Sequence, residues 1–117
     1  IANARENLDK EQSGFNFEKV KADARKQWNE ELSKIEVEGG THDDKVVFYT
    51  ALYHILIHPN ILQDVNGQYP VMESDQIKTA KGDRYTVFSL WDTYRNVHQF
   101  LSLVYPVTFK NSDTFPS

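Results

Sequence analysis

The stretch VVFYTALYHILI, residues 46–57, is apolar on nearly every side when it is drawn as a helix. Thr41 and Asp44, just before it, have the spacing of a capping box in which aspartate replaces the usual glutamate. Pro59 follows the run and favours a helix end there. Val, Ile and Tyr also favour strands, but the run is too long for a typical strand. We therefore predict a helix over about residues 42–58.

A helix that is apolar all round must be buried all round. A chain of 117 residues suits one small domain or a piece of a larger one, and 39% hydrophobic residues are enough for a core. Such a chain can hardly surround this helix by itself. Its first residue is also Ile1 rather than methionine. We therefore expect neighbouring chain, and any targeting segment, to lie outside this sequence.

Composition argues against several classes of protein. The net charge is −4 and the two signs are interspersed, so we expect no nucleic-acid partner. The absence of cysteine removes disulfides and thiolate metal sites. No apolar run approaches the roughly 18 residues of a membrane helix, so no membrane segment is expected in this chain.

Two further helices flank the apolar one. The first covers about residues 17–37 and the second residues 89–105, ending before Pro106. The first has a single apolar stripe, formed by Phe17, Val20, Ala24, Trp28, Leu32 and Ile35. Residues 2–10 suit a short exposed helix or a frayed arm.

Residues 59–88 form the longest irregular stretch. Asn66-Gly67 is a strong turn signal, and short strand pieces are possible around 68–71 and 85–88. Connections of this length are uncommon in compact domains and are more often functional than not.

The sequence FSLWDTYR, residues 88–95, combines aromatic and charged side chains. Ser89 and Asp92 have the spacing of a capping box, and local rules favour that interpretation. A cap alone does not explain why Trp91, Tyr94 and Arg95 surround the carboxylate. A flat ring beside a carboxylate and a guanidinium suits a sugar, because the ring covers C–H groups while the charged groups bind hydroxyls.

Other constellations are weaker. His54 and His58 have the spacing of a two-histidine zinc site, but no third ligand is evident and hydrogen-bonded histidines on a buried helix are favoured. The sequence DVNG, residues 64–67, lacks the other ligands of a calcium loop and indicates a turn. A pair of catalytic carboxylates cannot be derived within this chain.

Three blocks of sequence together resemble glycoside hydrolase family 92, the calcium-dependent exo-acting α-mannosidases that are abundant in gut Bacteroidetes. The blocks are VEGGT, FYTALYHILIHPNILQDVNGQYP and YTVFSLWDTYR. They occur in the family's order and spacing, and the similarity covers about residues 2–106.

The resemblance implies a mainly α fold and a fragment of a longer enzyme. Family members pack an N-terminal β-sandwich on an (α/α)6 barrel of paired helices. Residues 1–117 would then be a single piece, the N-terminal portion of that barrel, with a long irregular loop at 59–88. The helix at 42–58 would be an inner barrel helix and the one at 17–37 an outer one, which accounts for the burial requirement.

The resemblance also implies an inverting reaction, in which a carboxylic acid protonates the leaving oxygen and a carboxylate activates water. The family's acid, base and calcium positions lie in motifs that this chain lacks. We therefore expect no catalytic residue and no metal ligand here, calcium only in the whole enzyme, and no activity of the chain alone.

The substrate-binding residues that the resemblance implies are Asp92, Trp91 and Arg95, with Asp64 and Tyr69 as weaker candidates. The partner would be a mannose-containing glycan, in a bacterial enzyme that is periplasmic, secreted or at the cell surface. Many relatives have a GMDGKIH-like stretch where this chain has VMESDQIKTAKGD, so the linkage preferred is not fixed.

Two alternatives remain open from the residues. The chain could be a non-catalytic helical interaction module in which Asp92 only caps a helix, or part of another (α/α)6 glycosidase. A lone fragment would also be expected to self-associate through its apolar helix, since large apolar patches are rarely left bare.

Overall fold

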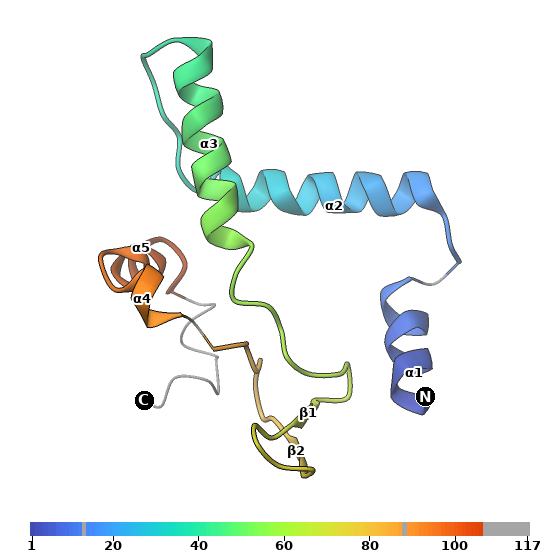
Figure 1. The fold of residues 1–117 in the computed structure, drawn as a ribbon. Helices are drawn as coiled ribbons and strands as arrows, with labels where there is room; N and C mark the ends of the chain where they lie inside the picture. The colour runs from blue at the N-terminus through green and yellow to red at the C-terminus, as the bar shows by residue number, and fades with distance from the viewer. Residues whose placement is uncertain (13, 88, 107–117) are drawn as a thin grey trace. The chain divides into compact units, whose positions relative to one another are not determined.

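The computed structural model describes residues 1–12, 14–87 and 89–106, which are mainly helical with two short strands (Figure 1). The elements, in chain order, are α1 (Ala2–Glu11), α2 (Phe17–Leu32), α3 (His42–Leu56), β1 (Gln68–Pro70), β2 (Ile77–Thr79), α4 (Leu90–Thr93) and α5 (Val97–Val104). Of the helices in these ranges, none combines the length and apolar character that a bilayer-spanning helix needs.

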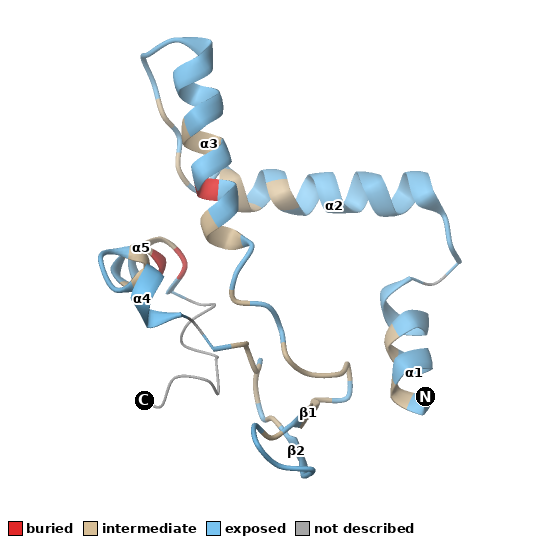
Figure 2. Ribbon diagram, in the orientation of Figure 1, coloured by how far each residue is buried: buried red, intermediate tan, exposed pale blue. Residues whose placement is uncertain are grey.

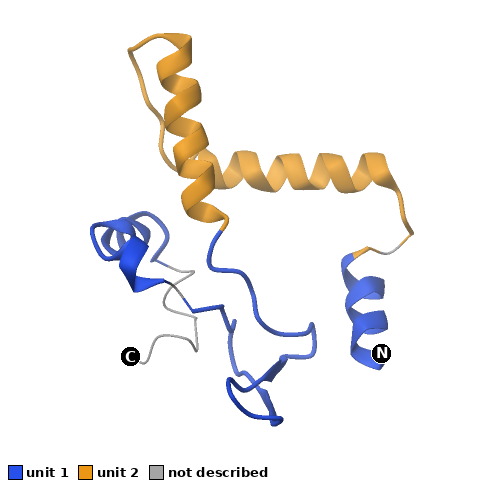
Figure 3. Ribbon diagram, in the orientation of Figure 1, with its two compact units in different colours: residues 1–11, 58–117 blue, residues 12–57 orange. Residues whose placement is uncertain are grey.

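The chain divides into two compact units (Figure 3). One unit contains residues 12–57 and holds α2 and α3. The other contains residues 1–11 and 58–117 and holds the remaining elements. The division follows from locality, because α2 and α3 are neighbours in sequence and pack on each other.

Helix α2 begins with a side-chain cap and ends earlier than predicted. The Asn16 Oδ1 accepts a hydrogen bond from the Lys19 backbone N–H at 3.0 Å, which satisfies one of the free donors at a helix start. The helix ends at Leu32 rather than near residue 37. Beyond Ser33, the Ile35 carbonyl accepts a hydrogen bond from the Tyr49 hydroxyl at 3.0 Å. This carbonyl is therefore used in a contact with α3 rather than in a further turn of α2.

Helix α3 has the predicted capping box. The Asp44 N–H donates to the Thr41 hydroxyl at 3.2 Å, and the Thr41 N–H donates to the Asp44 carboxylate at 2.8 Å. The helix ends at Leu56, two residues before the predicted end, because the Ile57 N–H already bonds the His54 carbonyl in a tighter turn and Pro59 lacks an N–H.

Burial on α3 is limited to one side (Figure 2). Leu52 is 3% exposed, whereas Val47 is 69% exposed. The Trp28 and Tyr53 rings meet edge to face with centroids 4.6 Å apart, which joins α2 to α3. The apolar character of α3 thus exceeds what residues 12–57 can cover.

The long stretch between α3 and α4 doubles back on itself. β1 and β2 pair antiparallel, with Gln68 opposite Thr79 and Pro70 opposite Ile77. Nearer its ends, the Leu62 N–H donates to the Arg84 carbonyl at 2.7 Å, and Ile61 and Tyr85 form an isolated bridge. At the predicted turn Gly67 has φ +83°, and its N–H donates to the Asp64 carbonyl at 2.8 Å.

The helix predicted over residues 89–105 is two helices. α4 ends at Thr93 and α5 begins at Val97. The break occurs because Asn96, with φ −155° and ψ −2°, leaves the helical conformation. Leu101 and Tyr105 are 3% and 4% exposed and anchor α5. The tail after residue 106, predicted to be a loop or a cut end, lies outside the described residues.

We predict that Thr41→Ala destabilises the start of α3 by about 1 kcal/mol, because the helix loses its side-chain cap. Hydrogen exchange at the amides of residues 42–45 should then be several-fold faster than in the unchanged chain. Thr41→Ser keeps the hydroxyl and should exchange at nearly the original rate. Equal exchange in all three proteins would contradict a stabilising role for the box.

Candidate functional site

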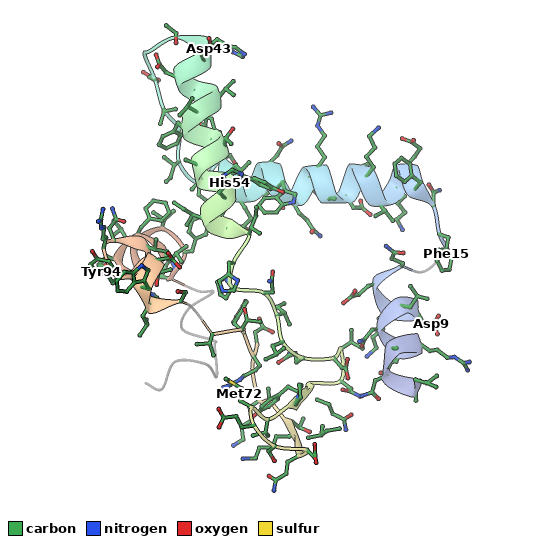
Figure 4. The ribbon with its side chains drawn as sticks, viewed as in Figure 1. Asp9, Phe15, Asp43, His54, Met72 and Tyr94 are labelled. Atoms are coloured by element: carbon green, nitrogen blue, oxygen red, sulfur yellow. The ribbon has the colours of Figure 1, made fainter. Side chains whose placement is uncertain are left out.

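A hollow with a volume of about 400 Å³ lies at α4 in the described part of the chain. It is lined by Trp91, Asp92, Tyr94 and Arg95, which belong to α4 and the turn that follows it. Trp91 is 86% exposed, so its indole face is open to a ligand. Figure 4 shows the side chain of Tyr94 at this helix. The site thus combines two aromatic rings, a carboxylate and a guanidinium.

Arg95 is oriented by its neighbour. Its Nε donates a hydrogen bond to the Tyr94 hydroxyl at 3.2 Å, and its guanidinium carbon lies 5.7 Å from the centre of the Tyr94 ring. This contact restricts the long arginine side chain to the region beside the phenol. Tyr94 therefore lines the hollow and braces Arg95, although the family resemblance alone assigned it no role.

Asp92 does not take part in the capping box that local rules favoured. Ser89 makes no side-chain cap hydrogen bond, and the Asp92 N–H instead donates to the Ser89 backbone carbonyl at 3.1 Å. The short α4 begins with a backbone turn, so the serine hydroxyl is not used there. This part of the interpretation was wrong, and the exposed carboxylate lies along the hollow.

Thr93 forms hydrogen bonds both within α4 and to α5. Its backbone N–H and its hydroxyl both donate to the Ser89 carbonyl, at 3.2 and 3.0 Å. The same hydroxyl oxygen lies 2.8 Å from Nε2 of His98 on α5. Thr93 and His98 are half-buried, unlike the exposed residues Asp92 and Tyr94 that flank Thr93.

Asp64 has structural partners near the start of the chain. Its two carboxylate oxygens accept hydrogen bonds from the Asn7 and Asn3 side-chain amides, both at 2.7 Å. The Oδ1 of the Asn7 side chain in turn accepts a hydrogen bond from the Val65 backbone N–H at 3.0 Å. These donors favour the ionised carboxylate and hold the pKa of Asp64 below its ordinary value, with Asn7 contributing most.

Tyr69, the other weaker candidate, lies on β1. It is half-buried, and the Arg84 guanidinium carbon lies 5.2 Å from its ring centre. Neither Tyr69 nor Asp64 is among the residues that line the α4 hollow. The structure thus brings together Trp91, Asp92 and Arg95 and leaves these two apart from that group.

The link between Asn3, Asn7 and Asp64 was missed from the sequence. The donors and the acceptor are separated by 61 and 57 positions, and Asn is common on exposed helices and in turns. The only available signal was that two asparagines, four residues apart, share one face of a helix with few apolar residues.

No three His, Asp or Glu side chains gather in a way that could hold a metal ion within residues 1–12, 14–87 and 89–106. His54 and His58 are exposed in this chain. His58 has another contact, since its Nε2 lies 3.3 Å from the Val87 carbonyl oxygen.

A mainly helical chain with aromatic rings, a carboxylate and a guanidinium around one exposed hollow has the composition of a sugar-binding site. Residues 3–112 match the family described as the glycosyl hydrolase family 92 catalytic domain. The chain therefore belongs to glycosyl hydrolase family 92.

Solved structures of that family resemble this chain. The family 92 alpha-mannosidase from Bacteroides thetaiotaomicron matches with a TM-score of 0.79 and 39% identity over 87% of this chain. The same values hold for that enzyme in complex with mannoimidazole. The family 92 glycosyl hydrolase ccman5 has a TM-score of 0.85 at 20% identity over 95% of this chain, which shows the fold alone.

A curated relative from Arthroderma benhamiae is described as an uncharacterized secreted glycosidase. It is 35% identical over 94 residues, which are 77% of this chain and 11% of the relative. The chain likewise covers between 13% and 15% of the solved structures named above. It thus corresponds to a small part of the length of each relative.

We predict that Asn7→Ala loosens α1 and raises the pKa of Asp64 toward its ordinary value, because both hydrogen bonds of the Asn7 side chain are lost. Carbon NMR of the Asp64 carboxyl group against pH, together with hydrogen exchange of α1, measures both effects. Asn29→Ala, at an exposed position on α2, is the matched control and should change neither.

The sign of the pH dependence follows from the lowered pKa. Asp64 should hold α1 above the pKa that it has in the unfolded chain and release it as the pH falls through the lower, folded-state value. A pKa that stays the same in Asn7→Ala would show that the amide does not act on this carboxylate.

Proposed function

We propose that this chain is part of the catalytic domain of a glycoside hydrolase that acts on α-linked mannose, and that the α4 hollow forms part of its sugar pocket. The observation that carries the proposal is the hollow itself, where Trp91, Asp92, Tyr94 and Arg95 come together. Its support is the 39% identity to an alpha-mannosidase that is also known in complex with mannoimidazole.

Each side chain of the hollow has a role that suits a hexose. The exposed Trp91 indole would cover a C–H face of the ring, which is apolar. The Asp92 carboxylate has two oxygens that can accept hydrogen bonds from neighbouring hydroxyls. Arg95, restrained by Tyr94, would donate to sugar oxygens or brace the pocket wall. Aromatic stacking and charge-assisted hydrogen bonds together would fix one orientation of the sugar.

The bond-breaking groups are proposed to lie elsewhere in the whole protein. In an inverting reaction the acid protonates the leaving oxygen and the base activates water on the opposite face of the sugar. The two carboxyl groups then lie roughly 6.5–9.5 Å apart to admit that water. The role of this chain would be to bind and orient the sugar, and the isolated chain would be inactive.

Calcium is proposed for the whole enzyme, but the described residues of this chain do not suit it as a complete site. Calcium takes six to eight oxygen ligands, with carboxylates prominent among them. No group of three candidate ligand side chains occurs within the described ranges. Both oxygens of Asp64 already accept amide hydrogen bonds. We therefore assign no step of the reaction to calcium through this chain.

We further propose that α3 is an inner helix and α2 an outer helix of an (α/α)6 barrel. The support is the exposure of apolar side chains on α3, such as Val46 and Val47, that residues 12–57 leave uncovered. Secretion of the whole protein is proposed from the curated relative, which is described as secreted. A purely capping role for Asp92, as in a helical interaction module, loses its support because the capping box does not form.

We predict that Asp92→Ala in the whole protein lowers kcat/KM for an aryl α-mannoside by about tenfold to a hundredfold, because hydrogen bonds to a charged acceptor are lost. Asp23→Ala removes an exposed carboxylate from α2 and should leave the rate unchanged. A rate for Asp92→Ala within twofold of the original would rule out the sugar-binding role.

The isolated chain is also predicted to self-associate. Val47 on α3 and Leu103 on α5 are 69% and 81% exposed, and large apolar surfaces are rarely left bare in water. Sedimentation velocity at tens of micromolar should show species larger than the 13.6 kDa monomer. Val47→Lys should reduce the amount of these larger species if α3 forms the contact between copies of the chain. A strictly monomeric chain would contradict this prediction.

A further inference from the structure

We propose that Thr93 and His98 act as a positioning pair that sets the orientation of the α4 hollow. The proposal rests on the sugar-binding function proposed above and adds two residues that do not line the hollow. Thr93 lies between Asp92 and Tyr94, and His98 lies on the next helix. Their contact joins α4 to α5.

Helix α4 needs such a support because few contacts within the helix hold it in place. It contains four residues, and Ser89 makes no side-chain cap bond. Trp91 and Tyr94 are 86% and 63% exposed, so packing does not fix the turn that carries them. The half-buried Thr93 is the exception, and its side chain forms two hydrogen bonds.

The direction of the contact with the histidine depends on the histidine tautomer, and one tautomer satisfies both contacts of the Thr93 hydroxyl. A hydroxyl group has one proton, and the Thr93 hydroxyl donates it to the Ser89 carbonyl at 3.0 Å. In the proposed pair, the Thr93 oxygen accepts from His98, whose Nε2 lies 2.8 Å away and carries the hydrogen.

His98 connects the hollow to the best-buried part of α5. Leu101, three positions further along, shares its helix face and is 3% exposed. Tyr105, 4% exposed, packs near Phe100 with ring centroids 6.3 Å apart. His98 and Thr93 thus connect α4 to the buried side of α5 and restrain its position. A small displacement of α4 would misplace Asp92 relative to a bound sugar.

The test uses isosteric substitutions in the whole protein. Thr93→Val removes the hydroxyl, and His98→Phe removes the N–H, while both approximately keep the shape. Each should lower kcat/KM for an aryl α-mannoside by about tenfold to a hundredfold, the range that small misplacements cause. The double variant should be no worse than either single one, since both remove the same contact.

Two further variants separate positioning from general stability. His98→Gln keeps an N–H donor near the position of Nε2 and should recover most of the lost rate. Ser102→Ala removes another side-chain hydrogen bond on α5, the one from its hydroxyl to the Gln99 carbonyl, and should leave the rate unchanged. Unfolding temperatures of the Thr93 and His98 variants should stay close to the original.

The results distinguish this inference from the function on which it rests. If Asp92→Ala lowers the rate but Thr93→Val and His98→Phe do not, or if their losses multiply in the double variant, the positioning pair is overturned. If Asp92→Ala has no effect, the proposed function fails first. In that case, and where a variant fails to fold, nitrogen NMR of the unchanged protein decides. A hydrogen on His98 Nε2 supports the pair, and the neutral tautomer with hydrogen only on Nδ1 overturns it.

Discussion

Burial of apolar surface is the constraint on which the rest of this structure depends. Among the described residues, Leu52, Leu101 and Tyr105 are the buried hydrophobic side chains, each 3% or 4% exposed. So small a core cannot position every element by packing. Hydrogen bonds therefore do much of the positioning. Some join near neighbours in sequence, as in the Thr41–Asp44 box and the Thr93–His98 contact, and others span long separations, as in the asparagine contacts of Asp64.

The same constraint explains which elements could be predicted from the sequence. The start of α3 was predictable because a capping box is a local pattern and needs no distant partner. The end of α2 was not, since it depends on a hydrogen bond from Tyr49 to Ile35, fourteen positions apart. The break between α4 and α5 was also missed, because the apolar periodicity of residues 89–105 continues through Asn96.

The candidate site shows a similar division. The composition of residues 91–95 indicated a sugar site, and the structure places Trp91, Asp92 and Arg95 around one hollow. The composition could not show which hydrogen bonds Ser89 and Asp92 form at the start of the helix. A capping box and a backbone turn compete for the same N–H group, and in this helix the Ser89 carbonyl accepts it. Asp64 and Tyr69 could not be separated from the site by spacing alone.

The order of the two units along the chain has a consequence for folding. Residues 12–57 are continuous, whereas the unit that contains Asp64 takes α1 from before them and the rest from after them. On a ribosome, α1 emerges before α2 and α3 and must wait for nearly sixty more residues before Asp64 is available. The α2–α3 pair can form during that interval, because its contacts are local in sequence. The discontinuous unit is therefore the one whose assembly follows that of the α2–α3 pair, and α1 is the segment left exposed to proteases in the meantime.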